Sequence, residues 1–524
     1  MKFKSGLIII YALMFSSYES LFANGSNESP PVTGNLPGNN FEYVVGTTLI
    51  QTKWGQGTPY NSMTPADNNG AHSHTGCWPV AVSQIMKYHE WPSRGSGQSE
   101  TYTASNLGKE IPSVSFNINY DWNNMLNTYT ANATVQEKNA VATLMFHIGV
   151  SLRSNFGTGS TGVSNETLVQ TALPTFFRYD KSSRYLFSDY YDYNTWEMML
   201  KEQIDAGQPA VYCPNQKSHA YIVDGYNTEG KFHFNCGWNG ANDGWYTLEE
   251  IREGEFNDKM LINIKPDKGG SSISEIVLDR FNPSKTSVRQ NELFTINIIT
   301  RNLGNIVNPV GQIGAALTDS SGNIIKIMGA VNYNALNPMS TRETNINCYV
   351  PETVTARQYQ LRIVTRPENG DWKIVTRSNL RLNILSVYNI TVTAGEANSG
   401  GYGRALTSFT TTAGSSVTLN GQFTFNAGIR VVDPFDTFPG GQLSAALVNN
   451  NNEIIAIGAL VGISSAGGTV GDRNFTIPNT LPLGSYKLRI VIRPTISTGV
   501  FGDWRIATMS TSPDIPTSYD ITLQ

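Results

Sequence analysis

Residues 75–89 read Thr-Gly-Cys-Trp-Pro-Val-Ala-Val-Ser-Gln-Ile-Met-Lys-Tyr-His, and this stretch predicts the centre of the first half of the chain. The apolar residues from Val80 to His89 have helical spacing, and Pro79 suits a first helical turn, where its missing N–H does no harm. Cys77 is therefore expected at a helix N-terminus. The helix dipole and free backbone N–H groups favour a thiolate there, which predicts a reactive cysteine.

More helices are predicted around this one. Residues 135–152 show helical spacing, with one apolar side made of Val141, Leu144, Met145, Ile148 and Leu152. A third helix is expected at 195–206, because Gly207 suits a left-handed helix stop and Pro209 then opens an extended segment.

Strands follow the helices. Residues 220–226 and 231–235 alternate like two strands of a hairpin, and 227–230 supply the turn. The stretch from about residue 41 to 267 is thus expected to be one α+β domain.

A change of character comes after Lys268-Gly269-Gly270-Ser271-Ser272, which is a flexible linker by composition. Beyond it, apolar and polar residues alternate and turn residues are frequent, a pattern typical of all-β sandwiches.

This second half repeats itself. Gly311-Gln312-Ile313-Gly314-Ala315-Ala316-Leu317 returns as Gly441-Gln442-Leu443-Ser444-Ala445-Ala446-Leu447, and the run 359–367 returns at 486–494. Both copies then reach Gly-Asp-Trp, at 370–372 and 502–504. Two copies of one module are predicted, 273–386 and 387–524, each the size of an immunoglobulin-like sandwich. Neither groups a nucleophile with a base, so a binding or spacer role is expected.

The N-terminus has the pattern of an export signal. Lys2 and Lys4 precede an apolar run from Leu7 to Phe15, and cleavage is expected near Ala23, which gives a signal peptide at 1–23. The apolar run is too short for a bilayer core that needs ~20 residues, so no stable membrane insertion is expected. Residues 24–40 then predict a flexible leader, and the protein is expected to be secreted, periplasmic or at the cell surface.

The amino-acid composition excludes few classes of function. The chain has 524 residues, of which 40% are hydrophobic and 15% charged, with a formal net charge of −4. No run of lysine and arginine is present to follow phosphates, which argues against nucleic-acid binding. The length suggests about three domains.

The chain has four cysteines, too few for a disulfide-built scaffold. Cys213, Cys236 and Cys348 are interpreted as small buried hydrophobic residues. The nearest approach to a metal motif is His72-x-His74, which has no obvious further ligands, so neither metal nor cofactor is expected.

Residues suited to thiol chemistry accompany Cys77. His219 lies 142 residues downstream (219 − 77) and opens a strand, a rigid position for a base; papain-like enzymes show a spacing of ~130–150 residues. Asn235 can hold the imidazole in its working tautomer, and Gln56 can donate its amide to an oxyanion beside the Cys77 N–H.

Together these segments resemble the streptopain family of cysteine peptidases. The likeness covers about residues 41–266 and rests on four blocks in the family's order, 53–61, 75–89, 219–225 and 235–244. It implies a papain-like fold, endopeptidase activity on proteins and a Cys77/His219 pair. It also implies Gln56 in the oxyanion hole and an apolar residue two before the cleaved bond. The loop around Gly157, Gly159 and Gly162 resembles the family's loop beside the substrate cleft, where Trp238 is also placed.

Two features depart from the family pattern. Members usually have tryptophan directly after the asparagine, where this chain has Cys236, so that indole is absent, although Trp238 remains. Family members also carry a long inhibitory prosegment, whereas only residues 24–40 separate signal and enzyme here. Restraint is therefore expected from a separate proteinaceous inhibitor, from the C-terminal modules, or not at all.

Together these features of the sequence favour an active endopeptidase. One alternative is a protease domain without activity that serves as a surface binding or adhesion protein, and Cys236 favours it. Another is an acyl-transferring enzyme on the same pair. The sequence contains no information on oligomeric state.

Overall fold

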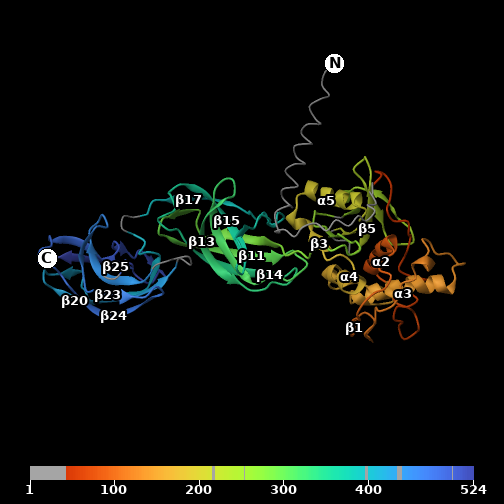
Figure 1. The fold of residues 1–524 in the computed structure, drawn as a ribbon, viewed down its shortest axis with the longest axis horizontal. Coiled ribbons are helices and arrows are strands. Elements are labelled where there is room, and N and C mark those ends of the chain that lie inside the picture. The colour runs from red at the N-terminus through yellow and green to blue at the C-terminus, as the bar shows by residue number, and fades with distance from the viewer. Residues whose placement is uncertain (1–42, 215–218, 253, 396–398, 433–438, 498–499) are drawn as a thin grey trace, which may run out of the picture. The chain divides into compact units, whose positions relative to one another are not determined.

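The structure is a computed structural model that describes residues 43–214, 219–252, 254–395, 399–432, 439–497 and 500–524. The predicted signal peptide and leader lie outside these residues. Within the described ranges, no helix is both long and apolar enough to cross a membrane. Figure 1 shows that the helices belong to the red-to-yellow-green part of the chain, whereas the described residues after 252 form strands.

The first part of the chain contains helices of very different length. The α-helices are α2 (Cys77–His89), α3 (Val135–Ser151), α4 (Val169–Phe177), α5 (Tyr193–Asp205) and α6 (Leu248–Ile251). Short 3₁₀ turns are η1 (Trp122–Asn124), η2 (Glu166–Leu168) and η3 (Ser188–Tyr190). Helix α2 begins at Cys77, three residues before the predicted start. The prediction placed the thiol just before the helix, whereas it lies on the first helical residue.

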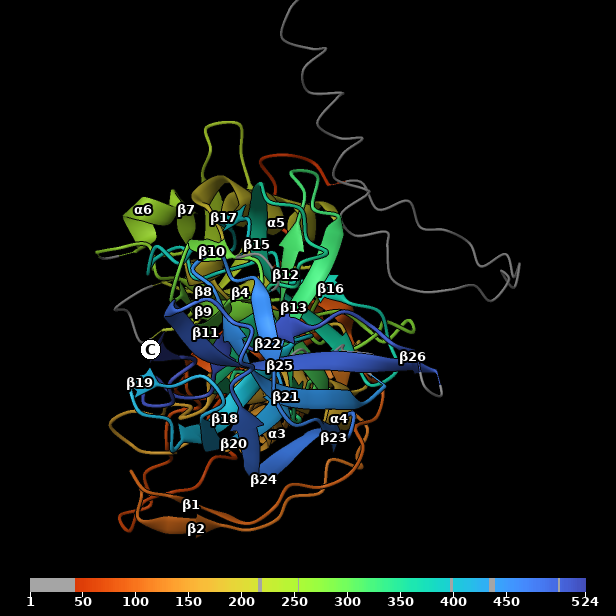
Figure 2. The same ribbon diagram turned by 90° about the vertical axis from the view of Figure 1, so that its left-hand side faces the viewer.

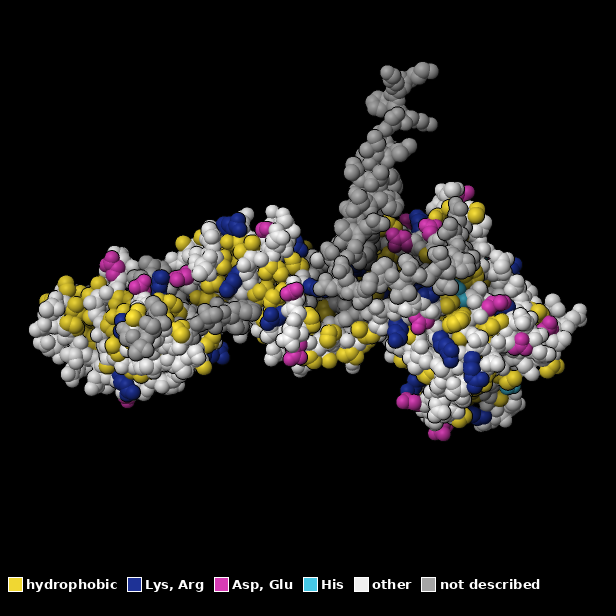
Figure 3. All heavy atoms as spheres, in the orientation of Figure 1, with side chains coloured by type: hydrophobic (Ala, Val, Ile, Leu, Met, Phe, Trp, Pro, Cys, Tyr) yellow, Lys and Arg dark blue, Asp and Glu magenta, His cyan; other side chains and the backbone are white. Residues whose placement is uncertain are grey.

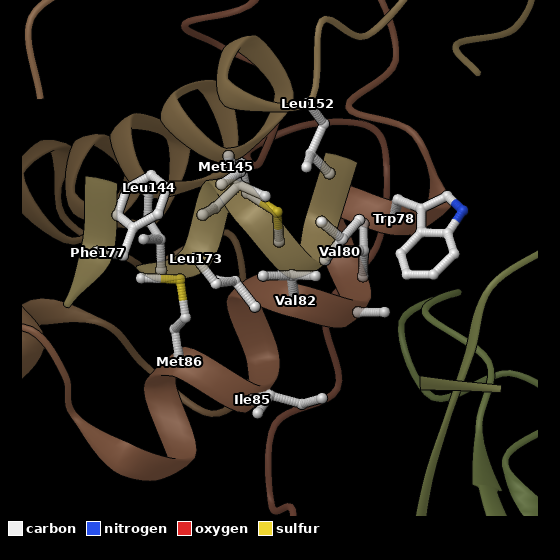
Figure 4. Close-up of a cluster of buried hydrophobic side chains, with 14 of the residues drawn as sticks. Trp78, Val80, Val82, Ile85, Met86, Leu144, Met145, Leu152, Leu173 and Phe177 are labelled. Carbon is white, nitrogen blue, oxygen red and sulfur yellow. The ribbon is translucent and has the colours of Figure 1, made fainter. Parts of the chain in front are cut away.

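Apolar sides of α2, α3 and α4 meet in one core (Figure 4). The apolar side predicted for α3 is confirmed, because its five residues are at most 2% exposed. Each such side chain contributes about 1.5–3 kcal/mol when buried. A capping box of Thr134 and Glu137 starts α3 by satisfying otherwise unpaired backbone N–H groups.

One six-stranded antiparallel sheet packs beside these helices. Its order is β3-β8-β4-β5-β6-β7, with bounds β3 (Arg184–Phe187), β8 (Lys259–Ile262), β4 (Ala210–Cys213), β5 (Tyr221–Tyr226), β6 (Phe232–Asn235) and β7 (Gly244–Tyr246). The predicted hairpin is β5–β6, and the predicted stop at Gly207 has the left-handed φ of 67°. Strands β1 (Tyr102–Ala104) and β2 (Lys109–Ile111) pair separately (Figure 2).

The second part of the chain first forms two sheets around a common core. One has the order β14-β11-β9, with β14 (Thr341–Tyr349), β11 (Leu293–Asn302) and β9 (Ile276–Pro283). The other has β10 (Ser287–Arg289), β17 (Tyr388–Thr393), β15 (Gln358–Pro367), β12 (Gly311–Thr318) and β13 (Ile324–Tyr333), with β16 (Lys373–Ile374) beside β15.

Two further sheets enclose a core of their own. The first has the order β24-β20-β18-β28, with β24 (Gly467–Thr476), β20 (Gln422–Val431), β18 (Arg404–Thr411) and β28 (Met509–Ser510). The second has β19 (Ser416–Val417), β29 (Tyr519–Leu523), β25 (Gly484–Ser497), β21 (Gly441–Val448) and β22 (Ile454–Ile457), with β23 (Val461–Ile463), β26 (Val500–Phe501) and β27 (Arg505–Ile506).

The predicted repeat is visible in the strand register. Gly311 pairs with Pro367 between β12 and β15, and Gly441 pairs with Pro494 between β21 and β25. The strands β21 and β25 lie side by side in Figure 2. The glutamine of each first strand accepts two hydrogen bonds from the arginine of its partner, Arg366 or Arg493. Each guanidinium also lies over the tryptophan of the Gly-Asp-Trp motif. Equivalent sequence blocks therefore make equivalent contacts.

The predicted boundary between the copies, near Ser386, is wrong. Strand β17 follows it in sequence, yet β17 pairs with β10 and β15 of the first copy. Ile390 and Val392 are buried in that copy's core. Because β17 is hydrogen-bonded to two strands of the first copy, that copy extends at least to Thr393.

The stretch predicted as a flexible linker is hydrogen-bonded. The Asp180 carboxylate accepts the backbone N–H of Lys268 at 3.4 Å and of Gly270 at 3.2 Å. A side chain at Gly270 would collide with this carboxylate, which explains the glycine. Composition alone misses this anchor because Asp180 is distant in sequence.

Charges of both signs are interspersed on the face shown in Figure 3. This matches the near balance of 37 basic and 41 acidic residues.

The buried imidazole of His147 on α3 predicts acid sensitivity. It is 6% exposed and hydrogen-bonded to the Tyr120 hydroxyl, and burial lowers its pKa from 6.5 to about 4. Unfolding therefore takes up a proton between these pH values, so stability falls as pH falls through that window. The loss is about 3 kcal/mol between pH 7 and pH 4.

We expect His147→Gln to reduce this pH dependence in urea unfolding followed at pH 7 and pH 4. The exposed His72→Gln is the control and should keep the wild-type dependence. An unchanged pH dependence in the His147 variant would contradict the prediction.

Candidate active site

Cys77 lies where chain segments distant in sequence converge. The preceding Gly76 has a φ of 92°, and a Cβ there would lie 3.1 Å from the Thr161 side chain. Glycine thus permits both the backbone turn and the close approach of the 157–162 loop. The Cys77 sulfur accepts hydrogen bonds from the backbone N–H of Ala220 and Trp78.

Burial raises the pKa of the Cys77 thiol, and the backbone N–H groups of Ala220 and Trp78 oppose this effect. The sequence predicted only the helix N-terminus, which favours the thiolate. The structure adds desolvation, which disfavours the charged sulfur and is the larger effect. A base beside the sulfur is therefore needed for thiolate chemistry.

His219 immediately precedes Ala220, whose N–H contacts the sulfur. The Nε2 atom of His219 lies 2.9 Å from the backbone carbonyl oxygen of Cys236. Because a carbonyl can only accept, Nε2 carries the proton, and in the neutral ring Nδ1 is left as the acceptor. Burial lowers the pKa of His219, and the Cys236 carbonyl partly offsets this. The ring is thus held in one tautomer, in which Nδ1 can accept a proton.

Asn235 does not perform this task in the structure. Its Oδ1 accepts hydrogen bonds from Gln84 at 3.0 Å and from the Gly237 N–H at 3.1 Å. Its amide nitrogen donates to the Thr52 carbonyl at 2.9 Å. The Cys236 carbonyl therefore replaces the predicted contact between Asn235 and the imidazole, because the buried Asn235 amide is hydrogen-bonded to Gln84, Thr52 and Gly237 instead.

An indole does cover the imidazole. The ring of Trp238 lies 4.6 Å from that of His219, at an angle of 40°. Trp238 remains 37% exposed, whereas Cys236 is 2% exposed and packs in the core. The expectation that replacement of the family's tryptophan by Cys236 leaves the histidine without an indole shield is thus wrong, since Trp238 supplies the cover from two residues further on.

A backbone hydrogen bond holds Gln56 close to the segment that leads into Cys77. Its carbonyl accepts the N–H of Thr75, two residues before Cys77, at 3.0 Å. Its side-chain amide has no hydrogen-bond partner among the described residues, so its N–H groups are available to a ligand. The preceding residue, Gly55, has no room for a Cβ atom, because the Asn239 side chain lies against it. This contact packs the 54–57 loop on the 235–240 loop.

The glycine loop lies against the residues that lead into Cys77. The Gly157 carbonyl accepts the His74 N–H at 3.1 Å, and the Thr161 hydroxyl donates to the His74 carbonyl at 2.7 Å. Gly162 accepts the Asn155 N–H. Added Cβ atoms at Gly159 and Gly162 would meet open space.

Gln84 connects two parts of the site, and its role was not predicted from the sequence. This residue of α2 is fully buried, accepts the Trp54 N–H at 3.0 Å and donates to Asn235 at 3.0 Å. A polar residue on the buried side of α2 was the signal that could have revealed it, since buried polar groups need partners.

The described residues contain no group of three or more side chains suited to a metal ion. His72 is one of the two histidines in the weak His-x-His motif, and its Nδ1 is hydrogen-bonded to the Thr64 carbonyl oxygen.

A thiol on the first residue of a helix, a histidine two residues before strand β5 of an antiparallel sheet, and the 54–57 loop packed on the 236–240 loop that holds this histidine define the class of papain-like cysteine peptidases.

Comparison with known proteins identifies a family within this class. The sequence profile of the Peptidase C10 family matches residues 54–246. Streptopain of Streptococcus pyogenes is 31% identical over 253 residues, which cover 42% of this chain and 63% of streptopain. The thiol protease/hemagglutinin PrtT of Porphyromonas gingivalis is 29% identical over 230 residues, 43% of this chain and 26% of PrtT.

A solved structure is also similar. The active wild-type interpain A cysteine protease of Prevotella intermedia is 32% identical; the match covers 42% of this chain and 94% of that one, with a TM-score of 0.38. Residues 54–246 therefore form a catalytic region of the Peptidase C10 family.

The Trp238 indole is expected to control the proton affinity of His219. Burial keeps that pKa low, so Trp238→Ala should raise it toward 6.5 by admitting water to the ring. NMR titration of the ring in a Cys77→Ala background measures this directly. Trp245→Ala is the matched control, because its indole packs on His233, 5.3 Å away. An unshifted His219 titration in the Trp238 variant would refute this assignment.

Gln84→Leu is expected to leave the Trp54 N–H buried without an acceptor. We expect a loss of about 1–3 kcal/mol in unfolding free energy, together with reduced peptide cleavage as the two loops separate. Urea unfolding and cleavage assays measure the two effects. Ser83→Ala, on the same helix, is the control, because the buried Ser83 hydroxyl has no hydrogen-bond partner in the part of the chain that the structure describes. Equal stability of the two variants would contradict the role given to Gln84.

Proposed function

We propose that this protein is a secreted cysteine endopeptidase that hydrolyses peptide bonds in proteins. The Cys77 thiol is the nucleophile and His219 is the base. The observation that carries the proposal is the hydrogen bond from His219 Nε2 to the Cys236 carbonyl, which leaves Nδ1 as a proton acceptor on the residue next to the sulfur's N–H donor.

In the proposed reaction, His219 Nδ1 takes the thiol proton as the sulfur attacks the substrate carbonyl. The Gln56 amide and the Cys77 N–H stabilise the tetrahedral oxyanion. The imidazolium then protonates the leaving amine, and the acyl group remains on the sulfur. Water, activated by the neutral imidazole, releases the acid and restores the thiol.

Asn235 has a positioning role in this proposal. It does not touch the imidazole; it holds the loop whose Cys236 carbonyl does. Trp238 and the glycine loop with Gly157, Gly159 and Gly162 border the site and are proposed to contact the substrate. No metal or cofactor is needed for any of these steps.

The remaining parts of the protein are proposed to support this activity. Residues 1–23 are the export signal, 24–40 a leader and 41–267 the peptidase domain, with the protein secreted, periplasmic or at the cell surface. The two repeated sandwiches are immunoglobulin-like modules for binding or spacing. A separate proteinaceous inhibitor is one means of restraint. The surface-binding alternative is not favoured, because Trp238 supplies the indole whose absence suggested it.

The test is reaction with a peptidyl epoxide, followed by mass mapping and cleavage assays on model peptides. We expect single labelling at Cys77 and no labelling or turnover in Cys77→Ala. His219→Ala should reduce both to background, because the Cys77 thiol, whose pKa is raised by desolvation, then has no base. Cys348→Ala, whose thiol is fully buried in β14, is the control and should behave like wild type. Normal turnover without Cys77 or His219 would overturn the proposal.

A further inference from the structure

The loop of residues 236–243 makes two contacts with the His219 ring. Strand β6 ends one residue before this loop, and β7 begins one residue after it. The carbonyl oxygen of Cys236 accepts the hydrogen bond from His219 Nε2, and the indole of Trp238 lies over the ring. The position of the imidazole therefore depends on the shape of the 236–243 loop.

Asp243 closes this loop at its base. The Oδ1 atom of Asp243 accepts a hydrogen bond from the backbone N–H of Cys236 at 2.8 Å, so the last residue of the loop holds the first. The Cys236 thiol adds a hydrogen bond to the carbonyl oxygen of Asn242 at 3.2 Å. The backbone of Cys236 is thus bound on both sides, by Asp243 at its N–H and by His219 at its carbonyl.

The backbone between these two ends is irregular. Asn239 and Asn242 have φ values of 57° and 63°, in the left-handed region that L-residues seldom adopt. One backbone hydrogen bond, from Ala241 to Trp238 at 3.1 Å, spans the middle of the loop, and the Asn239 N–H binds the Trp54 carbonyl at 3.1 Å. A strained segment keeps one conformation only when surrounding contacts fix it. The bond to Trp54 fixes the tip of the loop, which leaves its base to the carboxylate.

The hydrogen bond at the base is a strong one. Asp243 is partly buried, and burial raises the pKa of its carboxyl group, whereas the Cys236 N–H lowers it. The titratable or charged groups that face this carboxylate are His233, Lys53 and Asp224, and His233 Nδ1 is itself 2.7 Å from the Asp224 carboxylate. A backbone N–H bound to a carboxylate makes a charge-assisted hydrogen bond, which is roughly twice as strong as a neutral one.

Asp243 acts on the imidazole only through this backbone. In the described part of the chain, the Asp243 side chain makes no hydrogen bond to His219, and its bond goes to the Cys236 N–H instead. The shift in the pKa of His219 comes from burial and from the Cys236 carbonyl. The contribution of Asp243 is therefore geometric.

We propose that Asp243 is a positioning residue that holds His219 in its working orientation by fixing the backbone of Cys236. Without the carboxylate the loop opens at its base, and both the carbonyl and the indole move away from the ring. The inference rests on the proposed function and deepens it, because it extends the support of the base to a residue that does not touch the imidazole.

NMR of the His219 ring tests the proposal without any turnover, in a Cys77→Ala protein that carries ¹⁵N-labelled histidine. The Nε2–H signal, assigned by its loss in His219→Ala, should exchange slowly with water, because the Cys236 carbonyl holds that proton. Asp243→Ala should accelerate this exchange about tenfold, the usual effect of one lost hydrogen bond. An unchanged exchange rate would overturn the proposal.

Further variants separate positioning from general stability. Asp243→Asn keeps an oxygen that can accept the Cys236 N–H, and it should restore most of the slow exchange. Asp192→Ala is the matched control, because it removes a carboxylate that accepts the Thr195 N–H at 2.9 Å at the start of α5, and it should leave the His219 signal unchanged. If urea unfolding shows that Asp243→Ala does not fold, Asp243→Leu takes its place, with a similar shape and no acceptor. Equal acceleration in the Asp192 variant would assign the effect to stability and refute the proposal.

Peptide cleavage then distinguishes this proposal from the peptidase assignment. Asp243→Ala should lower kcat/KM about tenfold, and Asp243→Asn should recover most of it, because the base must be correctly oriented for the chemical step. If the wild-type protein cleaves peptides and Asp243→Ala cleaves them equally well, only the role of Asp243 fails. If the wild-type protein cleaves none while the exchange at His219 still depends on Asp243, the peptidase assignment fails and the positioning role stands.

Discussion

The buried amide of Gln84 is the interaction on which the site depends. One side chain on α2 binds the backbone of the 54–57 loop and the side chain of Asn235 at the same time. One partner, the Trp54 N–H, lies in a loop, and the other, Asn235, is the last residue of β6, directly before the loop that carries the Cys236 carbonyl. An unpaired polar group at 0% exposure is costly. The helix that carries Cys77 therefore also sets the position of the loops that carry Gln56 and the Cys236 carbonyl.

This arrangement explains how the site tolerates a cysteine after Asn235. The imidazole needs an acceptor for one nitrogen and an apolar cover for its ring, and neither has to come from a particular residue. Here a backbone carbonyl is the acceptor and Trp238 is the cover. Cys236 itself packs into the core on the other side of the loop. The role of each residue follows from where its atoms point rather than from its place in a motif.

The two C-terminal copies show how far repeated sequence determines repeated structure. Both keep the same strand pairing and the same contact of glutamine, arginine and tryptophan, because these depend on residues within the repeated blocks. The end of the first copy was misplaced for the opposite reason. Strand β17 pairs with β10, about one hundred residues earlier, and nothing local in its sequence marks that partnership.

The sequence by itself determined the helix behind Cys77, the apolar side of α3, the hairpin after His219, the repeat and the family. These follow from local spacing, turn residues and motif order, which each segment carries on its own. The tertiary structure decided which atom holds His219, what covers its ring, what closes the loop beside it and where the first sandwich ends. Those features join segments that are distant in sequence, and their partners are chosen by packing and strand register, which no single segment specifies.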